Sequence, residues 1–79
     1  MKYVYILKSL KNGDRHYTGI TDDLDKRLGE HNAGHVMHTS KFVPWKIETA
    51  MMFSNKDKAV KFEKYLKSGS GRAFATKRL

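Results

Sequence analysis

The sequence predicts one small α/β domain of the α+β type, in which a β-hairpin comes first and helical segments follow. Two β-favouring runs, residues 3–8 and 15–20, flank Asn12-Gly13, which is a strong hairpin signal. Two later segments combine helical periodicity with polar residues where a helix would begin. A chain of 79 residues is expected to form a single domain with a small core.

The length of the hairpin loop decides whether Tyr5 and Tyr17 share a face of the sheet. A two-residue Asn-Gly loop would pair Tyr5 with Ile20 and send Tyr17 to the opposite face. A three-residue loop with Gly13 in the left-handed region instead pairs Tyr5 with Gly19. We predict the second register, because only Gly19 leaves open space beside the Tyr5 ring.

The first helix is expected to begin near residue 23, with Asp22 as its N-cap and Gly34 as its stop. At about 100° per residue, one side of this helix is predicted to face inward. Four residues make up that side: Leu24, Arg27, Leu28 and His31.

A loop, a third strand and a second helix follow. Residues 35–44 show no clear period and are predicted to be a loop, while residues 45–53 are a strand candidate. Ser54 is the predicted cap of the second helix. The apolar side of that helix consists of Ala59, Phe62 and Leu66, and Glu63 falls within the inward stripe. The tail from Ser68 is either a turn into a short terminal helix or a flexible end.

Composition narrows the range of partners. Sixteen Lys and Arg against eight Asp and Glu give a net charge of +8, which favours nucleic acid first and an acidic membrane surface second. No apolar stretch approaches a membrane span and no signal-peptide pattern follows Met1, so we expect a soluble, cytoplasmic protein without a membrane partner. Because the chain lacks cysteine, a bound metal would need oxygen or histidine ligands, which favours hard cations such as Mg²⁺.

Glu63 is the strongest single sign of chemistry. An inward carboxylate is costly to bury, so it requires an arginine partner, a metal or a water-filled cleft. We favour metal binding over an Arg27–Glu63 ion pair, because five lysines on the outer side of the helix already make it soluble.

Four other residues are candidates for catalysis: Tyr5, Tyr17, Arg27 and His31. For the two tyrosines the alternative is core packing, the usual role of strand aromatics. Arg27 can clamp two phosphate oxygens, or it forms a salt bridge with Glu30. His31, with an ordinary pKa of about 6.5, suits proton transfer or a phosphate contact better than zinc binding.

Six residues are predicted to contact nucleic acid: Lys8, Gly19, Asn32, Thr39, Lys41 and Trp45. Thr39 and Lys41 would offer a hydroxyl and a positive charge, and Trp45 a stacking surface. A core position is the alternative for the indole of Trp45.

These residues, in this order, resemble the GIY-YIG nuclease superfamily. The first half-motif stands as Tyr3-Val4-Tyr5 and the second as Tyr17-Thr18-Gly19, eleven residues apart. Further matching segments are residues 19–28, Glu30-His31-Asn32, Gly34, Thr39, Pro44-Trp45 and Phe62-Glu63-Lys64. The resemblance is to the small single-domain bacterial branch, which is similar to the catalytic domain of structure-selective endonucleases of the Slx1 type. Tyr3 replaces the glycine of the motif, and Val4 and Thr18 replace its isoleucines.

The resemblance implies a three-stranded antiparallel sheet flanked by helices, with the active site on one sheet face. It implies hydrolysis of DNA phosphodiester bonds, with one Mg²⁺ or Mn²⁺ held by Glu63 and phosphate charge neutralised by Arg27. Tyr5 would accept a proton from the attacking water, which requires nearby positive charge to depress its pKa. Tyr17 and His31 would orient water or phosphate.

The predicted function is therefore a metal-dependent DNA endonuclease, structure-selective or single-strand processing, in repair or recombination. RNA remains an open substrate, and a protein partner could supply target selectivity. The alternative is a nucleic-acid-binding module that cuts poorly or only with a partner. In either case Tyr5, Tyr17, Arg27 and Glu63 are expected to converge on one cleft beside Gly19.

Overall fold

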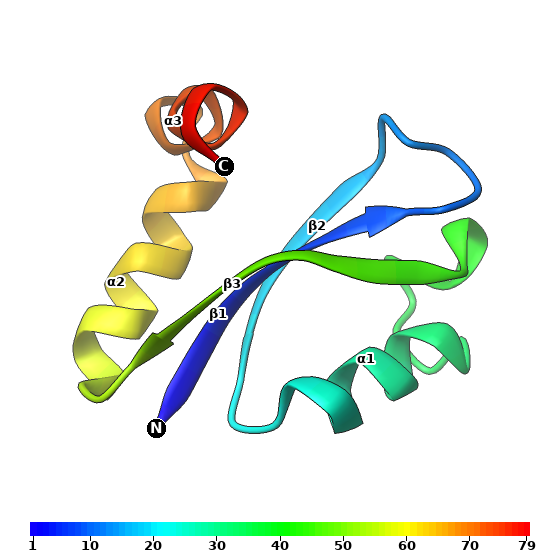
Figure 1. The fold of residues 1–79 in the computed structure, drawn as a ribbon, viewed down its shortest axis with the longest axis horizontal. Helices are drawn as coiled ribbons and strands as arrows, with labels where there is room; N and C mark the ends of the chain where they lie inside the picture. Colours follow the sequence, from blue (N-terminus) through cyan, green and yellow to red (C-terminus); the bar gives the residue numbers. More distant parts are fainter.

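The computed structural model covers residues 1–79 and places three helices around one sheet (Figure 1). In chain order the elements are β1 (Lys2–Ser9), β2 (His16–Thr21), α1 (Leu24–Asn32), a 3₁₀ turn η1 (Ser40–Phe42), β3 (Trp45–Phe53), α2 (Lys56–Lys67) and α3 (Gly69–Arg78). The sheet is antiparallel with strand order β2-β1-β3, so β1 is its central strand. The predicted fold class is thus confirmed. None of the helices has the length and apolar run needed to cross a bilayer.

The hairpin has the predicted register, although its loop is longer than expected. Tyr5 pairs with Gly19 and Leu7 with Tyr17. The strands end at Ser9 and begin again at His16, and the Ser9 hydroxyl accepts hydrogen bonds from two loop amides at 3.0 and 3.1 Å. The prediction of a left-handed Gly13 is wrong, because Gly34 alone has a positive φ. A side-chain hydroxyl, rather than a glycine, organises this turn.

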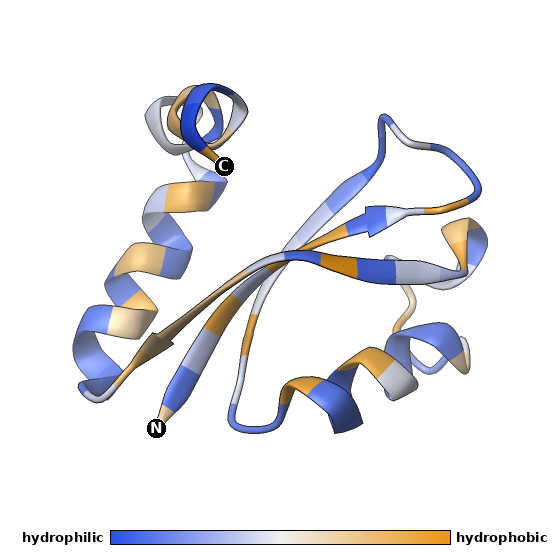
Figure 2. Ribbon diagram, in the orientation of Figure 1, coloured by the Kyte–Doolittle hydropathy of each residue, from blue (hydrophilic) through white to orange (hydrophobic).

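The sheet separates two small cores, because successive side chains of β1 point to opposite faces. The first core lies under α2 and contains Val4, Ile6, Ala59 and Leu66. The second lies under α1 and contains Tyr5, Leu7 and Trp45, with Leu24 and Leu28 packed against them. Apolar positions recur among polar ones along both helices (Figure 2), as the predicted inward stripes require.

Both predicted N-caps are one residue too early. Asp23, not Asp22, caps α1, and its carboxylate accepts a hydrogen bond from the amide three residues on at 3.1 Å. Asn55, not Ser54, caps α2 in the same way at 3.0 Å. In each case the observed cap has the extended backbone that aims its side chain at that amide. Asp22 instead forms an ion pair with Lys2 at 2.8 Å.

Different types of residue end α1 and α2, a glycine after α1 and a serine after α2. After α1 the chain reaches Gly34 with φ of 80°, so the predicted stop is confirmed. At Ser68 the chain turns directly into α3, and the Ser68 hydroxyl caps that helix by accepting from the amide of Gly71 at 3.1 Å. Of the two predictions for the tail, the short terminal helix is correct.

Gly71 allows α3 to pack closely on the end of α2. A β-carbon at Gly71 would collide with the backbone carbonyl of Tyr65 and would lie 2.7 Å from the Cα of Leu66. Gly71→Ala should therefore destabilise the protein by about 1–3 kcal/mol in urea unfolding, because the backbones must move apart. Replacing glycine by alanine usually stabilises a helix, so the expected loss of stability is opposite in sign to the usual effect.

Gly69→Ala is the matched control within the same helix. A β-carbon at Gly69 meets nothing within 4 Å, so the substitution should be neutral or stabilise by up to about 1 kcal/mol. Equal effects of the two substitutions would contradict close packing at Gly71.

Candidate active site

The Tyr5 ring lies against Gly19, its partner on the neighbouring strand. A β-carbon at Gly19 would overlap the phenol oxygen of Tyr5, so no other residue type fits this position without displacing the ring. Tyr5 is only 2% exposed. A buried phenol needs a hydrogen-bond partner, and the space that Gly19 leaves is occupied by the hydroxyl end of the Tyr5 ring.

That partner is His31 on α1. The phenol oxygen of Tyr5 lies 3.0 Å from Nε2 of His31, and Nδ1 of His31 lies 2.8 Å from the hydroxyl of Thr39. The Thr39 hydroxyl donates its own hydrogen to the Val36 carbonyl at 3.3 Å, so it accepts from Nδ1–H. Nε2 of His31 is then unprotonated, and Tyr5 O–H donates to it.

Burial sets the protonation states of this chain of hydrogen bonds. His31 is fully buried, which lowers its pKa, and the positive charge of Arg27 lowers it further against a small opposing effect of Glu30. His31 is therefore neutral at pH 7.

Burial also raises the pKa of the Tyr5 phenol. A hydrogen bond from Arg27 and its positive charge oppose this rise in the pKa of Tyr5. Repulsion from Tyr17 and Glu63, when these groups are negatively charged, adds to the rise. The sequence-based requirement that positive charge depress the pKa of Tyr5 is thus not met in this structure, because loss of solvation outweighs Arg27.

Arg27 lies beside the phenol of Tyr5 and forms an ion pair with a residue of its own helix. Its Nη1 donates to the Glu30 carboxylate at 3.0 Å, an i,i+3 ion pair. Glu30 first, and then Tyr5, raises the pKa of Arg27. Because a guanidinium has five N–H donors, the remaining donors of Arg27 can still hold a phosphate.

Tyr17 packs against both members of the central hydrogen bond. Its ring centroid is 6.5 Å from that of Tyr5 and 5.0 Å from that of His31. The ammonium of Lys67 lies 5.9 Å from the Tyr17 ring on the other side. Tyr17 therefore lies between the hydrogen-bonded residues Tyr5 and His31 and the C-terminal end of α2.

Glu63 faces inward, as predicted, but it is not unpaired. Its side chain is 14% exposed, and its carboxylate binds the ammonium of Lys67 at 2.7 Å. The partner is neither Arg27 nor a cluster of ligands, since no group of three or more His, Cys, Asp or Glu side chains lies together. A cation already sits on this carboxylate, and Mg²⁺ commonly uses one carboxylate together with water and substrate phosphates. The residue thus fits a metal that binds with the substrate.

The family profile described as the GIY-YIG catalytic domain matches residues 1–77. The chain belongs to the GIY-YIG family. Membership places it among nucleases, which act on DNA and generally use divalent metals. Tyr3, Val4 and Thr18 replace motif residues on β1 and β2 without changing the pairing of Tyr5 with Gly19.

Two uncharacterised proteins show the extent of the likeness. A UPF0213 protein of Cupriavidus necator is 37% identical, over 91% of this chain and 80% of that protein. The solution NMR structure of a UPF0213 protein from Bacillus halodurans is 31% identical, with a TM-score of 0.58, over 98% of this chain and 84% of that one. The fold and the family are therefore shared with small GIY-YIG proteins.

Several residues predicted to contact nucleic acid also have structural roles. Trp45 is 4% exposed and its indole N–H donates to the Thr39 carbonyl at 2.9 Å, so it offers no stacking surface. Thr39 is fully buried against His31. The side-chain oxygen of Asn32 accepts a hydrogen bond from the backbone N–H of Trp45 at 2.6 Å, and the side-chain nitrogen of Asn32 donates to the Trp45 carbonyl at 3.0 Å. Gly19 makes room for Tyr5.

The two predicted lysines differ in exposure. Lys41 is exposed and Lys8 is partly buried, so both stay available as predicted nucleic-acid contacts. Sequence reasoning did not single out Lys67 as the partner of Glu63. Its position four residues after Glu63 is the signal that could have found it.

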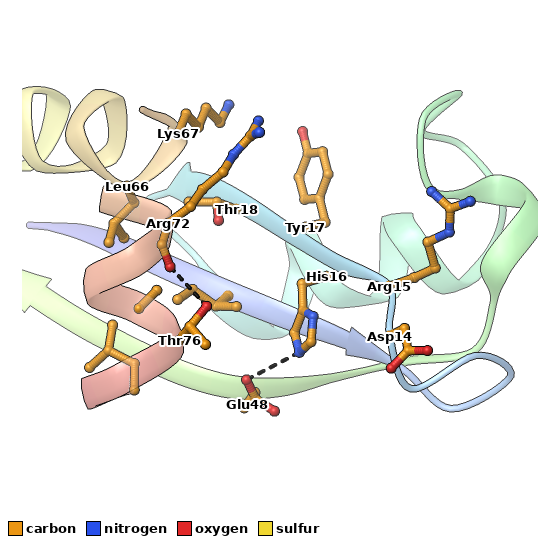
Figure 3. A pocket seen from close by; sticks show the side chains of 13 residues that line it. Asp14, Arg15, His16, Tyr17, Thr18, Glu48, Leu66, Lys67, Arg72 and Thr76 are labelled. Atoms are coloured by element: carbon orange, nitrogen blue, oxygen red, sulfur yellow. Dashed lines mark hydrogen bonds and ion pairs between the residues drawn. The ribbon is translucent and has the colours of Figure 1, made fainter. Parts of the chain in front are cut away.

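A groove of about 710 Å³ adjoins the cluster between the sheet and α3 (Figure 3). Of the four residues expected to share one cleft, only Tyr17 lines it. Tyr5 and Arg27 instead line a much smaller recess under α1. The four residues therefore do not line one cleft, and Glu63 lines neither cavity.

The lowered pKa of His31 gives a pH dependence of stability. The unfolded chain, whose histidine titrates near 6.5, binds more protons than the folded chain between that pH and the folded pKa. The melting temperature should therefore fall as pH is lowered from about 7 through 6. His31→Gln should flatten this dependence, and His35→Gln, at an exposed histidine, should leave it unchanged.

Equal slopes in wild type and His31→Gln between pH 7 and 5.5, measured by thermal unfolding, would show that His31 is not held neutral by the fold.

Proposed function

We propose that this protein is a metal-dependent endonuclease that hydrolyses DNA phosphodiester bonds. The observation that carries the proposal is the buried chain from Tyr5 through His31 to Thr39, flanked by Arg27 and Glu63. A core that needed only apolar packing would not require these polar groups. Their arrangement supplies one route for a proton and one site for phosphate charge.

The proton route runs through two side chains. The attacking water gives a proton to the phenol oxygen of Tyr5 as the phenol proton passes to Nε2 of His31, 3.0 Å away. Tyr5 then never exists as a free phenolate, which agrees with its raised pKa. Thr39 keeps the acceptor nitrogen toward Tyr5 by accepting from Nδ1. When the bond from phosphorus to the 3′ oxygen breaks, the leaving alkoxide takes a proton from solvent, and the imidazolium of His31 gives its proton back through Tyr5, which restores the resting site.

Arg27 and Tyr17 hold the phosphate in this mechanism. Arg27 donates to non-bridging oxygens with the N–H groups that Glu30 leaves free, and this contact strengthens as charge develops in the transition state. Tyr17 is half-buried beside His31, and its hydroxyl orients phosphate or water at the edge of the groove.

Glu63 would hold the divalent metal, most simply Mg²⁺. A bound metal would stabilise charge on the phosphate and on the leaving 3′ oxygen. Lys67 has to release the carboxylate first, because its ammonium lies 2.7 Å from it. Once released, Lys67 is a cation beside Tyr17 and available to the substrate.

The proposed role is strand processing in repair or recombination, on structured or single-stranded DNA. The same Lys67–Glu63 ion pair favours a second candidate, a nucleic-acid-binding domain that cuts only with a partner. In that case a partner would have to free Glu63 before metal binds.

Cleavage of single-stranded, duplex and branched DNA, with Mg²⁺ or EDTA, tests the proposal. EDTA and Glu63→Gln should abolish cleavage while binding is retained. Tyr5→Phe should lower the rate by about 10²-fold or more, and Arg27→Ala by about 10²–10³-fold. Tyr65→Phe, which removes a hydroxyl from an exposed ring on α2, is the matched control.

Cleavage that persists in Glu63→Gln would defeat the assignment of the metal ligand and indicate a contaminating nuclease. Metal-independent binding without cleavage of any DNA would support the second candidate.

A further inference from the structure

The groove beside the active site has a mixed lining of charged, polar and apolar residues, and its walls come from separate parts of the chain. One stripe of α3 forms one wall, with the helical spacing of Arg72, Ala75, Thr76 and Leu79. The opposite wall is the face of the sheet that also packs against α2, with Thr18 and His16 of β2 and Glu48 of β3. Figure 3 shows Lys67 and Arg72 beside Tyr17 at one end, and Arg15 at the other.

The positive charges of the groove differ in what they bind within the protein. Lys67 pairs with Glu63, and the guanidinium of Arg15 lies 4.7 Å from the centre of the Phe42 ring. Arg72 forms no ion pair with any acid of the chain. Its charge is thus free for an external anion.

The acids of the groove do not cancel this charge. Glu48 faces His16 at 3.5 Å, and Asp14 lies at the far end beside Arg15. The end nearest Tyr17 contains Lys67 and Arg72 with no acid lining the groove there. An anion is therefore favoured at the end that adjoins the active site.

We propose that this groove binds the phosphate backbone of one nucleic-acid strand next to the scissile bond, with Arg72 as its principal phosphate contact. The assignment rests on the proposed nuclease function, because Tyr17 belongs both to the groove and to the cluster around His31. A recess of about 710 Å³ has the size of a small-molecule site and takes one or two nucleotides of a single strand. It is too small for a duplex.

The test is fluorescence anisotropy with a short labelled oligothymidylate in EDTA, so that binding is measured without cleavage. Arg72→Ala should weaken binding about fivefold and reduce the salt slope by about 0.7, the value for one phosphate contact on a single strand. Thr76→Glu, which adds a carboxylate to the same wall, should also weaken binding.

Lys77→Ala is the matched control. It removes the same charge from an exposed position of α3 that does not line the groove, so binding should change less than twofold. Equal losses in Arg72→Ala and Lys77→Ala would refute the groove and leave only a general effect of net charge. An equal loss for a duplex of the same length would refute the single-strand assignment.

Cleavage measured on the same proteins separates this inference from the proposed function. A wild type that cuts DNA, with Arg72→Ala indistinguishable from Lys77→Ala in binding, refutes the groove alone. A wild type that cuts nothing, with a loss of binding specific to Arg72→Ala, supports the groove and refutes the nuclease.

Discussion

The close approach of Tyr5 to Gly19 is the constraint on which the rest of the site depends. Because β2 has no side chain at this point, the hydroxyl end of the Tyr5 ring can lie against it, and Tyr5 is only 2% exposed. The buried phenol then requires a hydrogen-bond partner, which fixes His31 on α1. His31 in turn requires Thr39, whose carbonyl receives the indole N–H of Trp45. One missing β-carbon thus leads to the placement of α1, the loop after it and the start of β3.

The charges around this buried chain are arranged as two neutralised pairs. Arg27 binds Glu30 within α1, and Glu63 binds Lys67 within α2. In the proposed mechanism, Arg27 would use the N–H donors that Glu30 leaves free, and Glu63 would bind a metal after Lys67 moves away. Only the Glu63–Lys67 pair would then be replaced when substrate and metal bind, whereas the Arg27–Glu30 pair would remain.

The sequence predicted what depends on local pattern and missed what depends on tertiary contact. The register of Tyr5 with Gly19 and the inward side of α1 follow from hydrophobic periodicity and the absence of a side chain at one position. The burial of Trp45 and Thr39, the raised pKa of Tyr5 and the choice of Lys67 as partner of Glu63 depend on how distant elements enclose these groups. Cap positions shifted by one residue, because several adjacent polar residues compete for the same role.

The mechanism and the placement of α1 both depend on one contact, in which Tyr5 donates its hydrogen to a neutral His31 whose proton is on Nδ1. Long-range proton–nitrogen NMR correlation of the histidine rings at pH 7 measures this tautomer directly. We expect Nδ1 of His31 to be protonated and Nε2 to be unprotonated. A His31 ring protonated on Nε2, or on both nitrogens at pH 7, would contradict this arrangement, because His31 would then offer Tyr5 no acceptor for its proton.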